Sequence, residues 1–481
     1  MLRINNFEFS TSFRENNKNP SAVNHVQDKD NMCNLAYLPY YRPFTPSFNA
    51  RWFNASDNKF QKAKEYFNKK YDELEDNKKR WNRNYLSAYN LDTLDGIQEG
   101  IPVFKGMTMK EIYFLTHYLK EIAVHRGCHN MCVHCYAEAK PPLLLKTEKD
   151  KSEKINQMSY EDYCALAEGF KELDKRLKGL LFEERELYLA LFHDADCSDI
   201  SIKDKQGNEH DFTELVDIMY EATQLPQVFD TSGWNPKDKK VQQKMEKLVQ
   251  YFLQDGNSEK FCFFNVSLNP FHSTNARYVK YIESDPQKAM KYRNIYTDRM
   301  ANVLYTLTPI IRNNKFEFIS RAFDNTHAGG YTEQALKELI DEILVKLENK
   351  YIEDIKCGNL KYVKNMEHMK SIMETIKNKA ESIDTLRLAQ GRAVNLVDKD
   401  DILFQRRKMI LEEYDIPESA VESSRFNAII DANGKVYMTN YLLTYPTEIQ
   451  LNFENKNKKT ADIKPDLQEK ILSKAMIEKK F

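Results

Sequence analysis

The sequence predicts an α/β fold built on a partial (β/α) barrel, because strand and helix patterns alternate six times along the chain. Short apolar runs typical of buried strands recur between about residues 121 and 395. Each run precedes a longer segment whose apolar residues recur every three to four positions, as in an amphipathic helix. Strands separated by helices usually pair in parallel through right-handed crossovers, so six such units predict an open (β/α)6 barrel.

The predicted elements have the following places. Strands are expected at 121–126, 187–192, 227–230, 261–268, 315–322 and 386–390. Helices are expected at 109–120, 159–179, 212–223, 239–254, 286–307, 332–350 and 362–383. The second of these helices opens on Ser159, with Asp162 three residues later, which is an Asp variant of the capping box. In barrels of this kind the chemistry lies at the carboxyl ends of the strands.

Two extensions flank the predicted barrel, so the chain is divided into 1–120, 121–395 and 396–481. The N-terminal extension combines an irregular polar arm with a helical pattern over 57–90. The C-terminal extension is expected to be a small α+β unit. Its turn Asp431-Ala-Asn-Gly434 lies between apolar runs and predicts a β-hairpin, because Asn-Gly readily adopts positive φ angles.

Charge and hydropathy exclude several classes of partner. The chain has 71 basic and 72 acidic residues, without the basic excess that nucleic-acid binding would favour. It contains no apolar run long enough to span a bilayer and no secretory signal at its start, so we expect a cytoplasmic protein with neither a membrane nor a nucleic-acid partner. The eight cysteines are then expected to be thiols or metal ligands and not disulfides.

Three of these cysteines form the motif Cys128-x3-Cys132-x2-Cys135, directly after the first predicted strand. Clustered thiolates suit iron or zinc. In a four-iron cluster, three cysteines leave one iron without a protein ligand, whereas structural zinc sites have four protein ligands. The spacing therefore indicates a reactive cluster. A zinc site with His129 or His134 as its fourth ligand is the alternative.

The segment from Cys128 to Tyr136 has the form C-x-N-x-C-x-H-C-Y and resembles the cluster loop of radical S-adenosylmethionine (SAM) enzymes, in a variant common in their peptide- and protein-modifying branches. The resemblance covers 121–395 in architecture but is specific only in this loop. It implies one [4Fe–4S] cluster and SAM as cofactors. One electron breaks a C–S bond of SAM, and the resulting 5′-deoxyadenosyl radical abstracts a hydrogen atom. It also implies a peptide or protein substrate and an electron donor such as flavodoxin or ferredoxin.

The resemblance further implies SAM contacts at the strand ends. Tyr136 would bring its backbone to the adenine, or its ring simply packs. Family members usually carry a Gly-Gly-Glu-like motif after the second strand. This sequence departs from it, so Asp194 or Asp196 would accept the SAM ammonium group, unless these residues only cap a helix. Ser232 and Gly233 resemble a family turn that approaches SAM, with an ordinary turn as the alternative.

The later strand ends complete the predicted cofactor site. Ser267 and Asn269 would bond the ribose hydroxyl groups, and Arg321 would pair with the SAM carboxylate. Gly391, in a Gly-Arg-Ala segment, would approach the adenine. His272 either faces the substrate or is a structural histidine.

The other cysteines have no short spacings, so core packing is expected for them and a second cluster is not; they are Cys33, Cys164, Cys197, Cys262 and Cys357. Two alternatives to a radical SAM enzyme remain. One is a zinc-binding structural or interaction protein, and the other is a protein that binds SAM without turnover.

Overall fold

The computed structural model describes residues 96–133, 135, 156–177, 179, 181–182, 188–192, 195–324, 330–380, 383–385, 427–439, 444–454 and 456–458. These residues form a mixed α/β structure, as predicted. The arm at 1–56, the helix at 57–90 and the strand at 386–390 lie outside the described residues, so they stay predictions.

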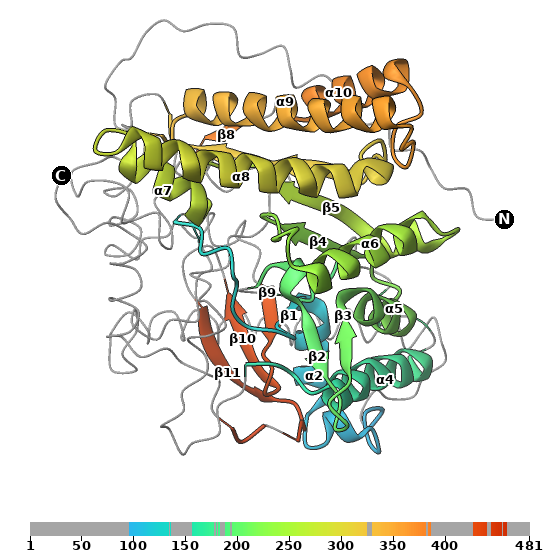
Figure 1. The fold of residues 1–481 in the computed structure, drawn as a ribbon. Helices are drawn as coiled ribbons and strands as arrows, with labels where there is room; N and C mark the ends of the chain where they lie inside the picture. Colours follow the sequence, from blue (N-terminus) through green and yellow to red (C-terminus); the bar gives the residue numbers. More distant parts are fainter. Residues whose placement is uncertain are drawn as a thin grey trace, which may run out of the picture.

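Parallel strands run through the structure in chain order (Figure 1). The central sheet pairs β4 (Gln227–Thr231) with β5 (Phe261–Ser267) and β5 with β6 (Phe316–Ile319), both in parallel. Single parallel bridges, Leu189 to Gln227 and Glu121 to Ala190, continue this order toward β1 (Leu119–Ile122).

Two further short strands lie beyond β6. They are β7 (Arg321–Ala322) and β8 (Asp384–Thr385), and they also pair in parallel. Parallel neighbours in chain order are what strands linked by crossover helices should give. The carboxyl ends of all these parallel strands therefore lie at one edge of the structure.

The crossover helices have bounds close to those predicted. They are α4 (Tyr160–Arg176), α5 (Phe212–Thr223), α6 (Lys239–Leu253), α8 (Pro286–Leu307), α9 (Glu333–Cys357) and α10 (Met366–Ala380), of which α9 continues seven residues past its predicted end at 350. The predicted helix before the first strand is α2 (Met109–Tyr118). The Ser159 hydroxyl accepts a hydrogen bond from the Asp162 N–H at the start of α4, so the predicted capping residue is confirmed. Short 3-10 helices lie at η4 (Pro102–Phe104), η5 (Cys197–Asp199), η6 (Asn257–Lys260) and η7 (Thr308–Ile310).

An aromatic core joins the helices to one face of the central sheet. The rings of Phe229 and Phe264 stack with centroids 4.1 Å apart, and Phe316 stacks on Phe264 from the next strand. Phe252 of α6 meets Phe264 edge to face at 5.7 Å. All four side chains are buried, and each contributes on the order of 2 kcal/mol from the apolar surface removed from water.

The C-terminal strands form the predicted hairpin but lie in an unpredicted place. β9 (Asn427–Ile430) and β10 (Lys435–Thr439) pair antiparallel around a turn in which Gly434 has φ 79°. β11 (Thr444–Gln450) extends the hairpin, and β9 also pairs in parallel with β1. The hairpin therefore belongs to a four-stranded sheet with the first strand, at the lower left of Figure 1.

Some predicted boundaries differ from the structure. The first strand begins two residues earlier than expected and ends at Ile122, and the predicted strand at 315–322 is divided into β6 and β7. The prediction missed α7 (Ser273–Tyr281), β2 (Ser201–Lys203), β3 (Glu209–Asp211) and β11. The three-residue strands β2 and β3 are too short for a period of two to be visible. α7 buries only one polar and one small side chain, so it has no apolar stripe.

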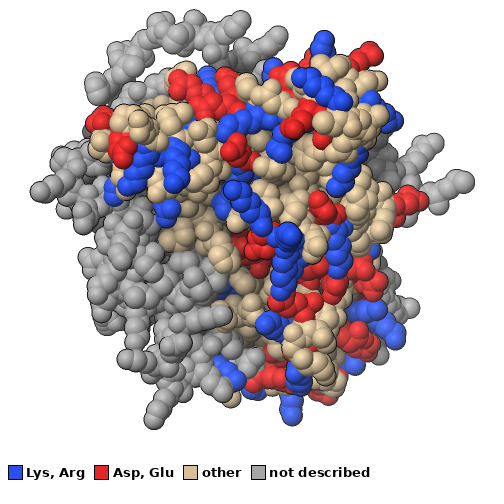
Figure 2. Space-filling view, viewed as in Figure 1, with Lys and Arg blue, Asp and Glu red and all other residues tan. Residues whose placement is uncertain are grey.

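The surface of the described part mixes both charge signs over most of the visible face (Figure 2). None of the helices in the described ranges has the length and apolar character needed to cross a membrane.

Candidate functional site

The cysteine loop, defined here as residues 127–135, leaves β1 beside the C-terminal hairpin. The Ala123 N–H donates to the Ile430 carbonyl at 2.8 Å. At the start of the loop, Arg126 Nη1 lies 3.8 Å from Asp431 Oδ1, and both side chains are buried. Hairpin and first strand together therefore fix where the loop begins.

Asn130, in the middle of the loop, contacts two other segments through its amide. Its Nδ2 donates to Asp196 Oδ2 at 2.8 Å, and its Oδ1 lies 3.2 Å from His272 Nε2. Asp196 precedes η5, and His272 precedes α7. The Asn130 side chain, 4% exposed, therefore joins the loop to the ends of the second and fourth predicted strands.

Asp196 accepts four hydrogen bonds from the protein. Oδ1 accepts from the Ser198 N–H at 3.0 Å and the Ser198 hydroxyl at 2.6 Å. Oδ2 accepts from Asn130 and from the Ser232 N–H at 2.7 Å. Burial and the neighbouring Asp199 raise the pKa of Asp196 to about 6. The carboxyl group thus connects the cysteine loop to η5 and to the end of β4.

Further contacts hold the loop on either side of Asn130. The His129 N–H donates to Asp199 Oδ2 at 2.9 Å, and its ring Nδ1 lies 2.9 Å from Asp199 Oδ1. The Val133 N–H donates to the Phe271 carbonyl at 2.7 Å. In Figure 1 this segment runs from β1 up to the lower end of α7, past the arrowheads of β4 and β5. The loop therefore lies at the carboxyl edge of the parallel strands.

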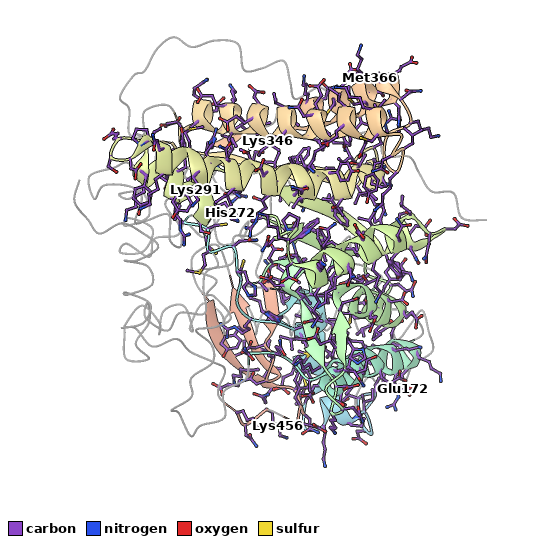
Figure 3. The ribbon with its side chains drawn as sticks, in the orientation of Figure 1. Glu172, His272, Lys291, Lys346, Met366 and Lys456 are labelled. Atoms are coloured by element: carbon purple, nitrogen blue, oxygen red, sulfur yellow. The ribbon has the colours of Figure 1, made fainter. Side chains whose placement is uncertain are left out.

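The buried side chain of His272, labelled in Figure 3, packs against α8, with its ring centroid 4.7 Å from that of Tyr296. Its Nδ1 accepts from the Thr274 N–H at 3.2 Å, and its Nε2 lies 3.2 Å from Asn130 Oδ1, to which it can donate only in the tautomer that carries the proton on Nε2. Arg299 Nη1 lies 2.9 Å from the same Nε2. Burial and the Arg299 charge lower the pKa of His272 well below its ordinary value. This histidine is structural in character, which was one of the two interpretations of the sequence.

Arg299 places a positive charge next to the cysteine loop. Its guanidinium contacts His272 Nε2 and Asn130 Oδ1, the latter at 3.4 Å. Within the described ranges no carboxylate lies at salt-bridge distance from its guanidinium. Burial lowers the pKa of Arg299 from its ordinary value, and the neighbouring Tyr296, Asp196 and Cys132 partly offset this effect. A partly buried guanidinium in this position can receive an anionic group of a ligand.

The three cysteines are free thiols of intermediate exposure. Burial, followed by Asp199 and Asp196, raises the pKa of the Cys128 thiol well above its ordinary value. No three His, Cys, Asp or Glu side chains in the described ranges are arranged to bind a single metal ion. A cluster sets a different requirement, since each thiolate binds its own iron. Three thiols on one anchored loop fit a cluster by the chemistry of their donor set.

The structure describes only some of the residues that were predicted to contact SAM. Tyr136, Asp194 and Gly391 lie outside the described residues, as does His134. The Ser232 N–H donates to Asp196, the carboxylate that also accepts from Asn130 of the loop. Gly233 has φ 94°, and a Cβ there would lie 2.5 Å from Met300 Sδ, so a side chain at this position would have to displace Met300 of α8.

The remaining predicted contacts follow the later strands. Asn269 Nδ2 donates to Ser267 Oγ at 2.6 Å, whereas the buried Asn269 Oδ1 has no hydrogen-bond partner among the described residues. An unsatisfied buried acceptor is costly, and a ligand hydroxyl would satisfy it. Arg321, 6% exposed, begins β7. None of these contacts to SAM is tested by the geometry, so they stay predictions.

Sequence reasoning missed Asn130, Asp199 and Arg299. Asn130 was visible as a polar residue inside the motif, but its partners come from 66 and 142 positions away. Arg299 lies within a helix whose charges look like those of any solvated face, and only the tertiary fold brings it to the loop.

Comparisons with protein families, with curated proteins and with solved structures found no match to this chain. The function is therefore inferred from the residues and from the geometry around them.

Proposed function

We propose that the chain is a radical SAM enzyme, with one [4Fe–4S] cluster bound by Cys128, Cys132 and Cys135. The observation that carries this proposal is the position of a three-cysteine loop at the carboxyl ends of parallel strands, anchored there by Asn130. Barrel and open α/β enzymes carry their reactive groups at this edge.

The proposed fold is a partial (β/α)6 barrel. The parallel order of β1, the bridge at 189–190, β4, β5 and β6 supports it, as does the separate parallel pair β7 and β8. In such an arrangement the loop after β1 would stand at the mouth of the barrel. The concave interior below it would be the space for substrate.

When bound, the cluster and SAM would supply one-electron cleavage of a sulfonium C–S bond and a carbon radical. The chain's own residues would bind and orient these groups. Arg299 offers a guanidinium fork suited to a carboxylate, and Arg321 is the candidate that the sequence pointed to for the same group. Asn269 Oδ1 would accept from a ribose hydroxyl, with Ser267 beside it.

The candidates for the SAM ammonium group are Asp194 and Asp196. Asp196 already accepts four hydrogen bonds from the protein, so it is better suited to hold the cysteine loop than to bind a ligand. The assignment to Asp194 rests on the sequence alone.

Three further parts of the proposal rest on the loop variant and on composition. They are a peptide or protein substrate, an electron donor such as flavodoxin or ferredoxin, and a cytoplasmic location.

Anaerobic purification and reconstitution tests the proposal. We expect about four irons per chain and the brown colour of iron–sulfur thiolate centres. Dithionite and SAM should then yield 5′-deoxyadenosine. Cys128→Ala, Cys132→Ala and Cys135→Ala should each lose the colour and the product. Cys357→Ala is the matched control, because this exposed thiol ends α9.

Each alternative has its own outcome. A colourless protein with one tightly held zinc would replace the enzyme with the zinc-binding structural or interaction protein. A brown protein that binds SAM but forms no 5′-deoxyadenosine would indicate the catalytically silent alternative.

A further inference from the structure

The helices α7 and α8 carry a compact group of basic and tyrosine side chains near their connecting turn. We call it the cationic surface; it consists of Arg277, Lys280, Tyr281, Lys288, Lys291 and Tyr292. Arg277, Lys288 and Lys291 are exposed. Figure 2 shows blue side chains gathered over the left ends of these helices, and Figure 3 labels Lys291 there.

Contacts within the cationic surface hold its side chains in place. Lys288 Nζ lies 3.8 Å from the ring centroid of Tyr281, and Arg277 Cζ lies 5.5 Å from that of Tyr292. The two tyrosine rings stack at 5.9 Å with an interplanar angle of 15°. Cation–π contacts of this kind limit the motion of long basic side chains without neutralising them. The surface is therefore an ordered array of positive charge.

The charge of this surface is only partly balanced by the acidic residues of the α7–α8 turn, Glu283 and Asp285. In the described ranges none of its four basic side chains forms a salt bridge with a carboxylate. The hydrogen bond from Lys288, with the charges of Lys288, Lys280 and Arg277, lowers the pKa of the half-buried Tyr281. Arg293 on the same helix differs, because Glu342 pairs with it at 2.8 Å. The positive potential is thus concentrated at the end of the helix pair.

This surface lies close to the cysteine loop. α7 begins directly after His272, whose Nε2 contacts Asn130 of the loop. With a rise of about 1.5 Å per residue, Arg277 lies roughly 8 Å and Lys280 roughly 12 Å along the helix axis from His272. One short helix therefore connects the cationic surface to the proposed cluster loop.

We propose that the cationic surface docks the protein that delivers the electron, a small acidic electron-transfer protein such as a flavodoxin. This inference rests on the proposed function, which requires one electron for each SAM cleaved. Opposite charges steer association and orient the two proteins, and tyrosine and arginine are enriched in protein interfaces. Glu283 and Asp285 flank the surface at the α7–α8 turn, so it suits a bounded acidic patch better than a continuous polyanion.

A binding experiment tests this docking without any turnover. The dissociation constant of oxidised flavodoxin is measured for the full chain at low and at high salt. The double variant Arg277→Glu/Lys280→Glu should weaken binding at low salt by about tenfold or more, and wild-type binding should fall as salt rises. Lys370→Glu/Lys377→Glu is the matched control with the same charge change, on α10 at the far end of the helical layer in Figure 1.

A second measurement separates docking from chemistry. Dithionite-driven formation of 5′-deoxyadenosine should be unchanged in the Arg277→Glu/Lys280→Glu variant, whereas flavodoxin-driven formation should fall. Absence of product with dithionite in the wild type would count against the proposed function, while the dissociation constants still decide the docking. Equal loss of flavodoxin binding in both double variants would overturn the docking proposal. So would absence of flavodoxin binding in the wild type alongside tight binding of RNA or anionic vesicles.

Discussion

Asn130 Nδ2 donates a hydrogen bond of 2.8 Å to Asp196 Oδ2, and this contact joins the cysteine loop to the strand ends around it. The same carboxyl oxygen accepts from the Ser232 N–H. Asn130 Oδ1 meets His272 on the opposite side. The position of the loop that carries the three cysteines thus depends on one amide that contacts two segments distant in sequence.

Asn130→Ala removes both contacts, and we expect it to lower iron retention. A hydrogen bond to a charged acceptor contributes about 1.5–3 kcal/mol, so the loop should open more often. Iron per chain after anaerobic reconstitution and desalting should fall by roughly half or more, with the circular dichroism spectrum preserved. Asn130→Asp should be at least as damaging, because it places a second carboxylate beside Asp196.

The control for this change is Asn208→Ala, in the exposed β2–β3 turn, where the side chain bonds to Asp204 and to no other described residue. Full iron retention by Asn130→Ala would show that the amide does not position the loop.

Local patterns in the sequence were sufficient for much of the fold. The bounds of α5 and α8 agree with those predicted, because each helix has clear start signals and a long apolar stripe. The hairpin at Asp431-Ala-Asn-Gly434 followed from turn chemistry alone. Its parallel pairing with β1 could not be predicted, since nothing in β9 specifies a partner more than 300 positions away.

The site was predictable only where its residues are close in sequence. The spacing of Cys128, Cys132 and Cys135 identified the loop, whereas Arg299 reaches it from a helix far along the chain. A carboxylate at the end of the second strand was also predicted, either as the acceptor of the SAM ammonium group or as a helix cap, and Asp196 does cap η5 by accepting from the Ser198 N–H. The structure shows Asp196 occupied by protein donors, and only the tertiary contacts of Ser232 and Asn130 could have revealed this.

Arg299→Ala should weaken SAM binding through loss of the carboxylate contact. Removing a charged hydrogen-bond partner costs about 1.5–3 kcal/mol, which corresponds to a rise of roughly 10- to 150-fold in the dissociation constant. Decarboxylated SAM, which lacks the carboxylate, serves as the internal control, and its affinity should hardly change. The opposite outcome is that Arg321→Ala, and not Arg299→Ala, makes the affinities for SAM and decarboxylated SAM equal. In that case Arg321 binds the carboxylate.

His272 should make the protein less stable as the pH falls below about 6.5. Its folded pKa is lowered by burial and by Arg299, whereas the unfolded chain has the ordinary value of about 6.5. Below that pH the unfolded state binds a proton that the folded state does not, so the stability present above it is lost as the pH falls. The slope from this group is at most about 1.4 kcal/mol per pH unit.

Urea unfolding of the wild type and of His272→Gln at pH 7.5, 6.5 and 5.5 would measure this effect. The difference in stability between the two proteins should shrink toward acid pH, since the variant has no such proton to bind. Parallel pH profiles would mean that the folded state protonates His272 as readily as the unfolded chain does.

Gly233→Ala should destabilise the fold through packing as well as through backbone conformation. Gly233 has φ 94°, and a Cβ there would approach Met300 Sδ to 2.5 Å and Val303 Cγ2 to 3.7 Å. Strain in the positive-φ region and displacement of a buried methionine each cost on the order of 1–3 kcal/mol. Gly207→Ala separates the two effects, because Gly207 has φ 86° with no heavy atom within 4 Å of the added carbon. Thermal unfolding should therefore show a larger loss at position 233 than at position 207. Equal losses at both positions would mean that Met300 moves aside freely, and that the glycine after β4 is required by backbone conformation alone.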